Sequence, residues 1–126
     1  MGMSEREFAT YKERAFEFIW GELASLEDEI EETGHVPRES LWPKFLDVGF
    51  LGQMVPDEYG GLGLSESQFL QFEKEWSKVH GGIRTILHVH NLGSEILQHG
   101  TDEQKAAYYP RIARKTPSRQ GIWPPR

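Results

Sequence analysis

The feature that most constrains the fold is a short pattern, Ser/Thr-x-x-Glu/Gln, that occurs three times just before an apolar run. It appears as Ser4-Glu5-Arg6-Glu7, Ser65-Glu66-Ser67-Gln68 and Thr101-Asp102-Glu103-Gln104. In such a capping box the hydroxyl accepts a hydrogen bond from the backbone N–H three residues on, and the acid or amide side chain reaches back to the first N–H. Each box satisfies N–H groups that the start of a helix leaves without partners. Three helix starts in one short chain favour an all-α fold.

Apolar residues recur at helical spacing after these starts and predict about five helices. The predicted segments cover residues 4–34, 37–49, 65–80, 83–97 and 101–115. Gly34, Gly49 and Gly100 mark helix ends, and Pro37 suits the first position of a helix, where its missing N–H would have no helical partner. Since no segment predicts a strand, we expect an all-α orthogonal or up-down bundle.

The connections carry four further expectations. Phe50–Pro56 is expected to be an extended apolar stretch. The loop Gly60-Gly61-Leu62-Gly63 has three glycines in four residues, which predicts positive φ angles or a close approach of the backbone. Gly81-Gly82 is expected to separate the third helix from the fourth. Pro110 lies inside the last predicted helix, where it predicts a kink or an early end.

The charge of the chain is uneven. The formal net charge is −6, with 8 basic and 20 acidic residues through Glu103, then 6 basic residues and no acidic one from Gln104 onward. We interpret the basic end as cations at a helix C-terminus followed by a tail, with binding to an anionic partner as the alternative. The acidic body argues against nucleic acid as the main ligand.

Length and composition indicate one domain, because 126 residues lie within the usual size of a single domain. No run approaches the ~20 apolar residues that span a bilayer, and no signal peptide is evident, so we expect no membrane span. With no cysteine in the chain, disulfides and thiol chemistry are excluded, which suits a cytoplasmic protein.

Patterns that would carry chemistry are few. His88 and His90 are two residues apart, so on a helix they point to nearly opposite sides and one metal ion could not readily take both. The acidic run at residues 27–32 is interpreted as a solvated face rather than a metal site. The loop at residues 60–63 precedes a helix start and could cradle a phosphate, but it lacks the lysine of a P-loop, and a tight connection is the simpler interpretation. We therefore predict no metal site and no catalytic residue.

Two longer segments carry a more specific signal. Residues 49–52, Gly-Phe-Leu-Gly, followed by residues 55–65, Val-Pro-Asp-Glu-Tyr-Gly-Gly-Leu-Gly-Leu-Ser, resemble the pattern "lGllG…vPEeyGGlGls" near the start of acyl-CoA dehydrogenases. Residues 100–105 and 108–110 resemble that family's "GteeQKxxyLP" segment. Both occur in order and at the family's spacing, and the resemblance runs from about Phe8 to Arg114. The chain is identified as a member of the acyl-CoA dehydrogenase family, covering its N-terminal helical domain only.

The resemblance implies a three-part flavoprotein of fatty acid metabolism. In this family an N-terminal helical domain, a middle β domain and a C-terminal helical bundle together hold FAD. A carboxylate base takes the α-proton of acyl-CoA, the β-hydride goes to flavin N5, and electrons pass to an electron-transferring flavoprotein. The complete enzymes are homo-oligomers, tetramers or dimers. Because the base lies in the third domain, no residue here is assigned a catalytic role, and the cofactor-binding residues are unknown.

The resemblance stops close to Arg114. In the family a "TEPxxGSD" stretch follows and opens the β domain, whereas residues 116–126 here are rich in Pro and Arg. We expect residues 1–115 to form the N-terminal domain and residues 116–126 a disordered tail unrelated to the family. A truncated or frameshifted gene is the favoured explanation, with a natural short paralogue as the alternative. The chain alone is expected to be inactive, to bind FAD weakly or not at all, and to be able to self-associate.

The same resemblance places Arg84, His88 and Val89 at or near the floor of the acyl-chain pocket. Two polar groups there would shorten or polarise the pocket, because burying an unpaired charge is costly, and this predicts a short or polar acyl group. The alternative for Arg84 and His88 is a role in surface or helix packing. For the whole chain, the alternatives are a stand-alone helical interaction module or a fragment of a related flavin oxidase or monooxygenase.

Overall fold

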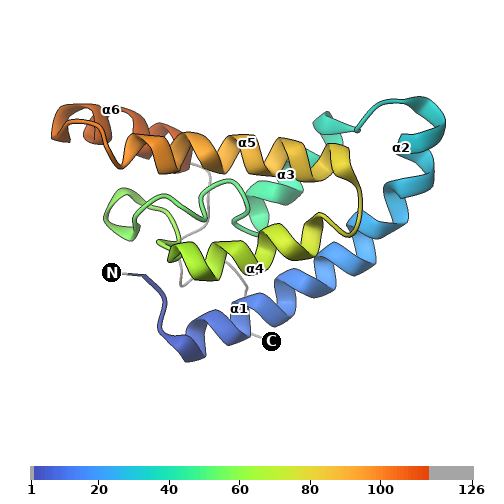
Figure 1. Ribbon diagram of the computed structural model, residues 1–126, viewed down its shortest axis with the longest axis horizontal. Coiled ribbons are helices and arrows are strands. Elements are labelled where there is room, and N and C mark those ends of the chain that lie inside the picture. Colours follow the sequence, from blue (N-terminus) through green and yellow to red (C-terminus); the bar gives the residue numbers. More distant parts are fainter. Residues whose placement is uncertain (1, 114–126) are drawn as a thin grey trace.

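The computed structural model describes residues 2–113, which form helices joined by turns, with no strand among them (Figure 1). The helices are α1 (Glu5–Phe18), α2 (Glu27–Thr33), α3 (Arg38–Asp47), α4 (Glu66–Trp76), α5 (Gly81–Leu97) and α6 (Asp102–Ala113). A π-helical turn, Ile19–Leu23, and a 3₁₀ turn, Ala24–Leu26, join α1 and α2 into one rod. The prediction of an all-α fold with about five helices is confirmed.

All three predicted capping boxes are present. The Ser4 hydroxyl accepts from the Glu7 N–H at 3.1 Å, and the Glu7 carboxylate accepts from the Ser4 N–H at 2.9 Å. The same reciprocal pair of bonds forms in the boxes that begin at Ser65 and Thr101, at 2.9 to 3.2 Å. These local bonds therefore set where α1, α4 and α6 begin.

Two prolines differ from the prediction. Pro37 lies one residue before α3 rather than at its first position, with φ −76° and ψ 74°. The N–H of Arg38 donates to the carbonyl of Val36 across it at 2.8 Å, which makes an inverse γ-turn. The early end predicted at Pro110 is wrong, because α6 continues through it to Ala113.

The prediction that Gly81-Gly82 separates two helices is wrong. The pair forms the first turn of α5. The break falls on residues 77–80 instead. His80 makes this start possible, because its Nδ1 accepts from the N–H of Gly82 at 2.9 Å and so caps the helix.

The segment Phe50–Pro56, predicted as extended, is a series of turns buried in the centre of the domain. It begins at Gly49, whose φ is 76°. There the N–H of Phe50 donates to the carbonyl of Phe45 at 2.9 Å, and the N–H of Gly49 to that of Leu46 at 3.1 Å. This pair of bonds is a Schellman motif, and it turns the chain from α3 directly into the core.

Side chains from distant helices satisfy the buried turns. The Tyr11 hydroxyl donates to the carbonyl of Val48 at 2.8 Å and accepts from the Gln53 amide at 3.1 Å. Asn91 Nδ2 donates to the carbonyl of Phe50 at 2.9 Å. Burial raises the pKa of Tyr11 far above its ordinary value, so the hydroxyl keeps the proton that it donates. The turns are thereby tied to α1 and α5.

The glycine-rich loop behaves as predicted. Gly60 and Gly63 have φ angles of 93° and 63°. Gly61 meets the buried turns so closely that an added β-carbon would lie 2.2 Å from the carbonyl oxygen of Val55. Positive φ and close backbone approach both occur within these four residues.

The core is built around two fully buried aromatic rings, Phe50 and Phe72. Their centroids are 5.8 Å apart. Rings from α1, α3 and α4 surround them with centroid distances of 5.3 to 6.2 Å: Phe8, Tyr11, Phe16, Phe18, Phe45 and Trp76. A second, smaller cluster of Val55, Tyr109 and Ala113 packs α6 against the buried turns.

Helix α4 lies between α1 and α5, with α5 running antiparallel to it along the opposite edge of the domain (Figure 1). Phe8 of α1 contacts Phe72 of α4 with ring centroids 6.1 Å apart, and α4 packs against α5 on its other side. Within residues 2–113, none of the helices has the length and apolarity that crossing a lipid bilayer requires.

Replacing Gly61 by alanine tests the close packing of this loop. Because the new β-carbon would meet the backbone of Val55, Gly61→Ala should lower the free energy of unfolding by at least about 2 kcal/mol. The matched control is Gly21→Ala, whose β-carbon meets nothing within 4 Å and which should raise the free energy of unfolding by ~0.5–1 kcal/mol. Urea denaturation followed by far-UV circular dichroism measures both, and equal stability of the two variants would contradict the packing described.

Candidate functional site

Two of the three predicted pocket residues meet at one partly buried carboxylate. Arg84 and His88 lie one turn apart on α5, and both face Glu73 of α4. Arg84 Nη2 is 3.5 Å and His88 Nδ1 is 2.7 Å from the same oxygen, Glu73 Oε2. The other oxygen, Oε1, accepts from the indole N–H of Trp76 at 3.0 Å. The Glu73 side chain is 12% exposed, so this cluster joins α4 to α5 with both carboxylate oxygens occupied.

The cluster changes the expected electrostatics of Arg84 and His88. Because a carboxylate only accepts, the Nδ1 of His88 must carry a proton. The charge of Arg84 is compensated by Glu73, so it is not the unpaired buried charge that was expected to polarise a pocket. Val89 does not join the cluster; its side chain points to solvent.

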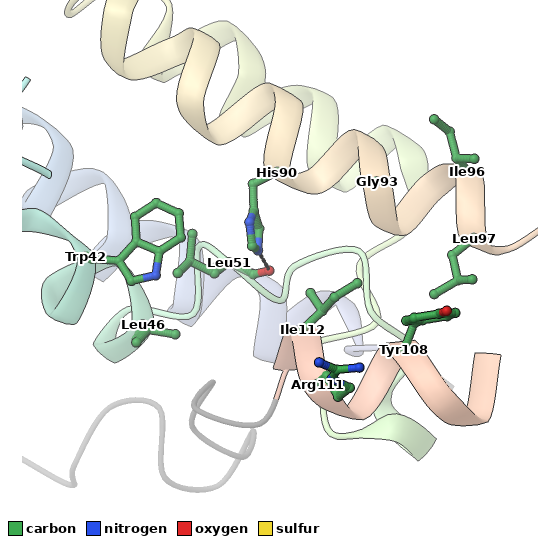
Figure 2. Close-up of a pocket in the computed structure, with 10 residues that line it drawn as sticks. All are labelled: Trp42, Leu46, Leu51, His90, Gly93, Ile96, Leu97, Tyr108, Arg111 and Ile112. Atoms are coloured by element: carbon green, nitrogen blue, oxygen red, sulfur yellow. Dashed lines mark hydrogen bonds between the residues drawn. The ribbon is translucent and has the colours of Figure 1, made fainter. Parts of the chain in front are cut away.

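A groove lies between α3, α5 and α6, apart from this cluster (Figure 2). This groove has a volume of about 660 Å³. Its lining residues are Trp42, Leu46, Leu51, His90, Gly93, Ile96, Leu97, Tyr108, Arg111 and Ile112. A cavity of this size, mostly apolar with few polar groups, has the usual character of a ligand or peptide site. None of Arg84, His88 and Val89 lines it.

His90 is a partly buried polar side chain in the wall of the groove. Its Nε2 lies 2.8 Å from the carbonyl of Leu51, as Figure 2 shows, and the ring meets the indole of Trp42 edge-on with centroids 5.6 Å apart. Burial lowers the pKa of His90 below its ordinary value, against the smaller opposing effect of the bond to Leu51. His90 is therefore neutral near pH 7 with its proton on Nε2, because a carbonyl can only accept.

The two histidines of the His88-Val89-His90 sequence therefore reach different elements, Glu73 of α4 and the buried turn at Leu51. Their divergence agrees with the predicted geometry of residues two apart on a helix. Within residues 2–113, no group of three histidine, aspartate or glutamate side chains is placed to hold a metal ion.

The loop considered for phosphate lies beside a hollow of about 320 Å³ whose walls carry carboxylates. Asp57, Glu58, Glu66 and Glu95 all line it. Four acidic side chains would repel a phosphate, and the N-terminus of α4 is already capped by Ser65 and Gln68. The loop therefore serves as a tight connection.

The family model described as "Acyl-CoA dehydrogenase, N-terminal domain" matches residues 5–116. The chain is similar to the mitochondrial isovaleryl-CoA dehydrogenase of Solanum tuberosum, with 30% identity over 105 residues that cover 81% of this chain and 26% of that protein. It is similar to the 3-(aryl)acrylate reductase of Clostridium sporogenes, with 34% identity over 96 residues that cover 75% and 25%.

A third relative is the short-chain specific acyl-CoA dehydrogenase of Clostridium acetobutylicum, which is 33% identical over 111 residues that cover 86% of this chain and 29% of that protein. The chain thus spans about a quarter of the length of these curated relatives. No solved structure matches the chain significantly.

The lowered pKa of His90 predicts a specific loss of stability in acid. The unfolded chain takes up a proton at this residue near pH 6.5, whereas the folded chain resists it, so stability falls as the pH drops below about 6.5 and is unaffected above it. His90→Gln keeps an amide that can donate to Leu51 but does not titrate. The free energy of unfolding is measured for both proteins in urea from about pH 5 to pH 8. The value for the wild type minus that for the variant should decrease toward low pH, because only the wild type loses stability through this residue. A constant difference would contradict the prediction.

Proposed function

Because this chain belongs to the acyl-CoA dehydrogenase family, we propose that it is the N-terminal helical part of an FAD-dependent enzyme that dehydrogenates acyl-CoA at the α and β carbons. The observation that carries the proposal is the match of the family's N-terminal domain to residues 5–116. Relatives named as dehydrogenases and as a reductase align over the same region. The complete enzyme would pass electrons to an electron-transferring flavoprotein, form a homo-oligomer and act in the cytoplasm.

Within that enzyme, the proposed role of this domain is one wall of the acyl-chain pocket, formed by Arg84, His88 and Val89. Two features of the structure support it. Arg84 and His88 are partly exposed although Glu73 anchors them, and Val89 presents an apolar side chain to solvent one residue further along α5. A covering domain or an acyl chain would thus meet an apolar surface beside a compensated polar one. Although Glu73 compensates its charge, Arg84 keeps a polar group beside Val89, and a polar wall favours a short or polar acyl group.

The hollows described above do not fit FAD. The groove offers one guanidinium, that of Arg111, to a cofactor with two phosphates, and the smaller hollow is lined by carboxylates. In the proposed enzyme, most flavin contacts therefore come from the other domains.

A second candidate is a stand-alone helical interaction module. The exposed apolar side chains of α5, Val89, Leu92 and Ile96, favour it, since contiguous apolar surface marks interaction sites. The two candidates differ in whether this domain supports flavin chemistry when the other domains are present.

The isolated 126-residue chain should not turn over acyl-CoA, because the catalytic base and most flavin contacts belong to other domains in the proposed enzyme. The purified chain should lack the visible absorption of bound flavin and should not reduce an electron-accepting dye when acyl-CoA is added. Yellow protein, or acyl-CoA-dependent dye reduction, would overturn this prediction.

A chimera tests the proposed role directly. Residues 1–113 replace the aligned segment of the Clostridium acetobutylicum enzyme, and kcat/KM is measured for acyl-CoAs of increasing chain length. The chimera should be active and prefer short acyl groups, and Arg84→Leu should shift the preference toward longer chains by roughly tenfold. Arg6→Leu, an exposed arginine on α1, is the matched control and should change nothing. A preference for long chains that Arg84→Leu leaves unaltered would disprove the pocket role, and an inactive but folded chimera would favour the interaction module.

A further inference from the structure

The ring of His80 lies between helices α2 and α5 and contacts both. Its Nε2 is 3.0 Å from Glu31 Oε2 on α2, and its Nδ1 accepts from the N–H of Gly82 at 2.9 Å. The His80 side chain is 15% exposed, whereas that of Glu31 is 72% exposed. A largely buried imidazole therefore connects the last turn of α2 with the first turn of α5.

The two contacts fix the protonation state of this ring. A backbone N–H only donates, so Nδ1 of His80 must carry a lone pair, and a carboxylate only accepts, so Nε2 must carry the proton. The ring is thus neutral. Protonation would place a second hydrogen on Nδ1, facing the N–H of Gly82 as donor against donor, and the cap would be lost. The bond to Glu31 would survive, because Nε2 remains a donor and gains a positive charge beside the carboxylate.

The two histidines inside α5 differ from His80 in this respect. His88 faces a carboxylate oxygen of Glu73, and His90 faces the carbonyl of Leu51. Both partners accept hydrogen bonds, so both contacts are compatible with a protonated ring. Among these three histidines, His80 is the one whose protonation must break a hydrogen bond.

The first turn of α5 depends on the cap that His80 provides. This turn begins with Gly81 and Gly82, and glycine is the weakest helix former after proline. A β-carbon on Gly82 would lie 3.1 Å from Nδ1 of His80, so the ring packs directly on the helix end. A positive charge there is unfavourable, because a helix N-terminus carries a partial positive charge. Without the cap, the sequence favours a helix that begins at Ile83.

The charges around His80 leave Glu31 as its partner. Within residues 2–113, Glu31 is the acidic side chain that forms an ion pair with His80. Of the cations nearby in sequence, Lys78 binds Glu75 at 3.2 Å and Arg84 binds Glu73 at 3.5 Å. The other titratable side chains of the adjoining segments are exposed: Glu27, Asp28, Glu29, Glu32, His35, Arg38 and Lys74.

We propose that His80 is a pH-sensitive switch between α2 and α5. When its ring is neutral, it binds Glu31 and caps α5. When the ring is protonated, it stays bound to Glu31, releases the N–H of Gly82 and opens the first turn, so that α5 begins near Ile83. This turn leads into Arg84, but the inference concerns the chain itself and does not rest on the proposed function.

Amide exchange with solvent, measured by two-dimensional NMR on the full chain, tests the switch. The protection of an N–H is its exchange rate in an unstructured peptide divided by its measured rate at the same pH. The probes are the N–H of Gly82 and that of Arg84, which donates to the carbonyl of His80 at 3.0 Å. Their protection relative to that of Asn91, farther along α5, should fall by roughly fivefold between about pH 8 and pH 5, as expected for the loss of one cap.

Two substitutions of His80 separate capping from titration. His80→Asn keeps a side chain that caps helices but does not titrate. It should hold the protection of Gly82 within about threefold of the wild type at pH 8 and remove its pH dependence. His80→Ala should lower this protection at every pH. His90→Gln is the matched control, because it removes another titrating group of α5 and should leave the pH dependence at Gly82 unchanged.

A substitution on α2 tests the connection to Glu31. Glu31→Leu removes the acceptor that holds the ring and should lower the protection of Gly82 at pH 8 by about threefold. Glu32→Leu, also exposed on α2, should not. The proposal is overturned if the protection of Gly82 does not change with pH or falls no more than that of Asn91. It is also overturned if His80→Asn keeps the pH dependence of the wild type, or if Glu31→Leu and Glu32→Leu have equal effects.

Discussion

A stretch of irregular backbone lies at the centre of this helical domain and must find hydrogen-bond partners there. Residues 48–55 are almost entirely buried, and a buried carbonyl or N–H without a partner costs about 1–3 kcal/mol. Three other parts of the chain donate hydrogen bonds to the buried carbonyls. The donors are Tyr11 on α1, His90 and Asn91 on α5, and the backbone N–H groups of residues 62–64. Because these donors are far apart in sequence, satisfying the buried turns also fixes how the helices are placed around them. The aromatic packing at Phe50 then follows, since the Schellman motif delivers that ring into the core.

Local chemistry explains which parts of the fold could be predicted. The capping boxes at Ser4, Ser65 and Thr101 need only neighbouring residues, and all three form. Gly60 and Gly63 have positive φ for equally local reasons. The segment Phe50–Pro56 was predicted wrongly because an apolar run resembles an extended stretch until its partners are known, and Tyr11 and Asn91 lie about forty residues away. The predicted start of α5 is wrong because His80 caps the helix through its Nδ1. The residues usually found at this position are Ser, Thr, Asp and Asn, so the sequence does not mark His80 as a cap.

The candidate site shows the same division. The sequence pointed to Arg84 and His88 through their resemblance to a family segment, but it gave no sign of Glu73, the carboxylate that binds both. One local feature could have pointed to Glu73. It lies three residues before Trp76, and its carboxylate accepts a hydrogen bond from the indole N–H of that residue. The groove at His90 could not be predicted from the sequence either, because its walls come from α3, α5 and α6 and no motif links these helices. The predicted tail, residues 116–126, lies outside the described residues, as do Arg114 and Lys115.

The π-helical turn between α1 and α2 affects how the residues of that rod align with those of a regular helix. The N–H of Ala24 donates to the carbonyl of Ile19, five residues back, so the turn holds one residue more than an α-helical turn. The buried positions of this rod, at Phe8, Tyr11, Ala15, Ile19, Leu23 and Ile30, are spaced by 3, 4, 4, 4 and 7 residues, which is already a regular helical period. The 3₁₀ turn that follows, Ala24–Leu26, holds fewer residues per turn than an α-helix, so the wide turn and the tight turn offset each other and neither flank is rotated away from the core. An alignment of this region to other chains should therefore run through both turns without a gap.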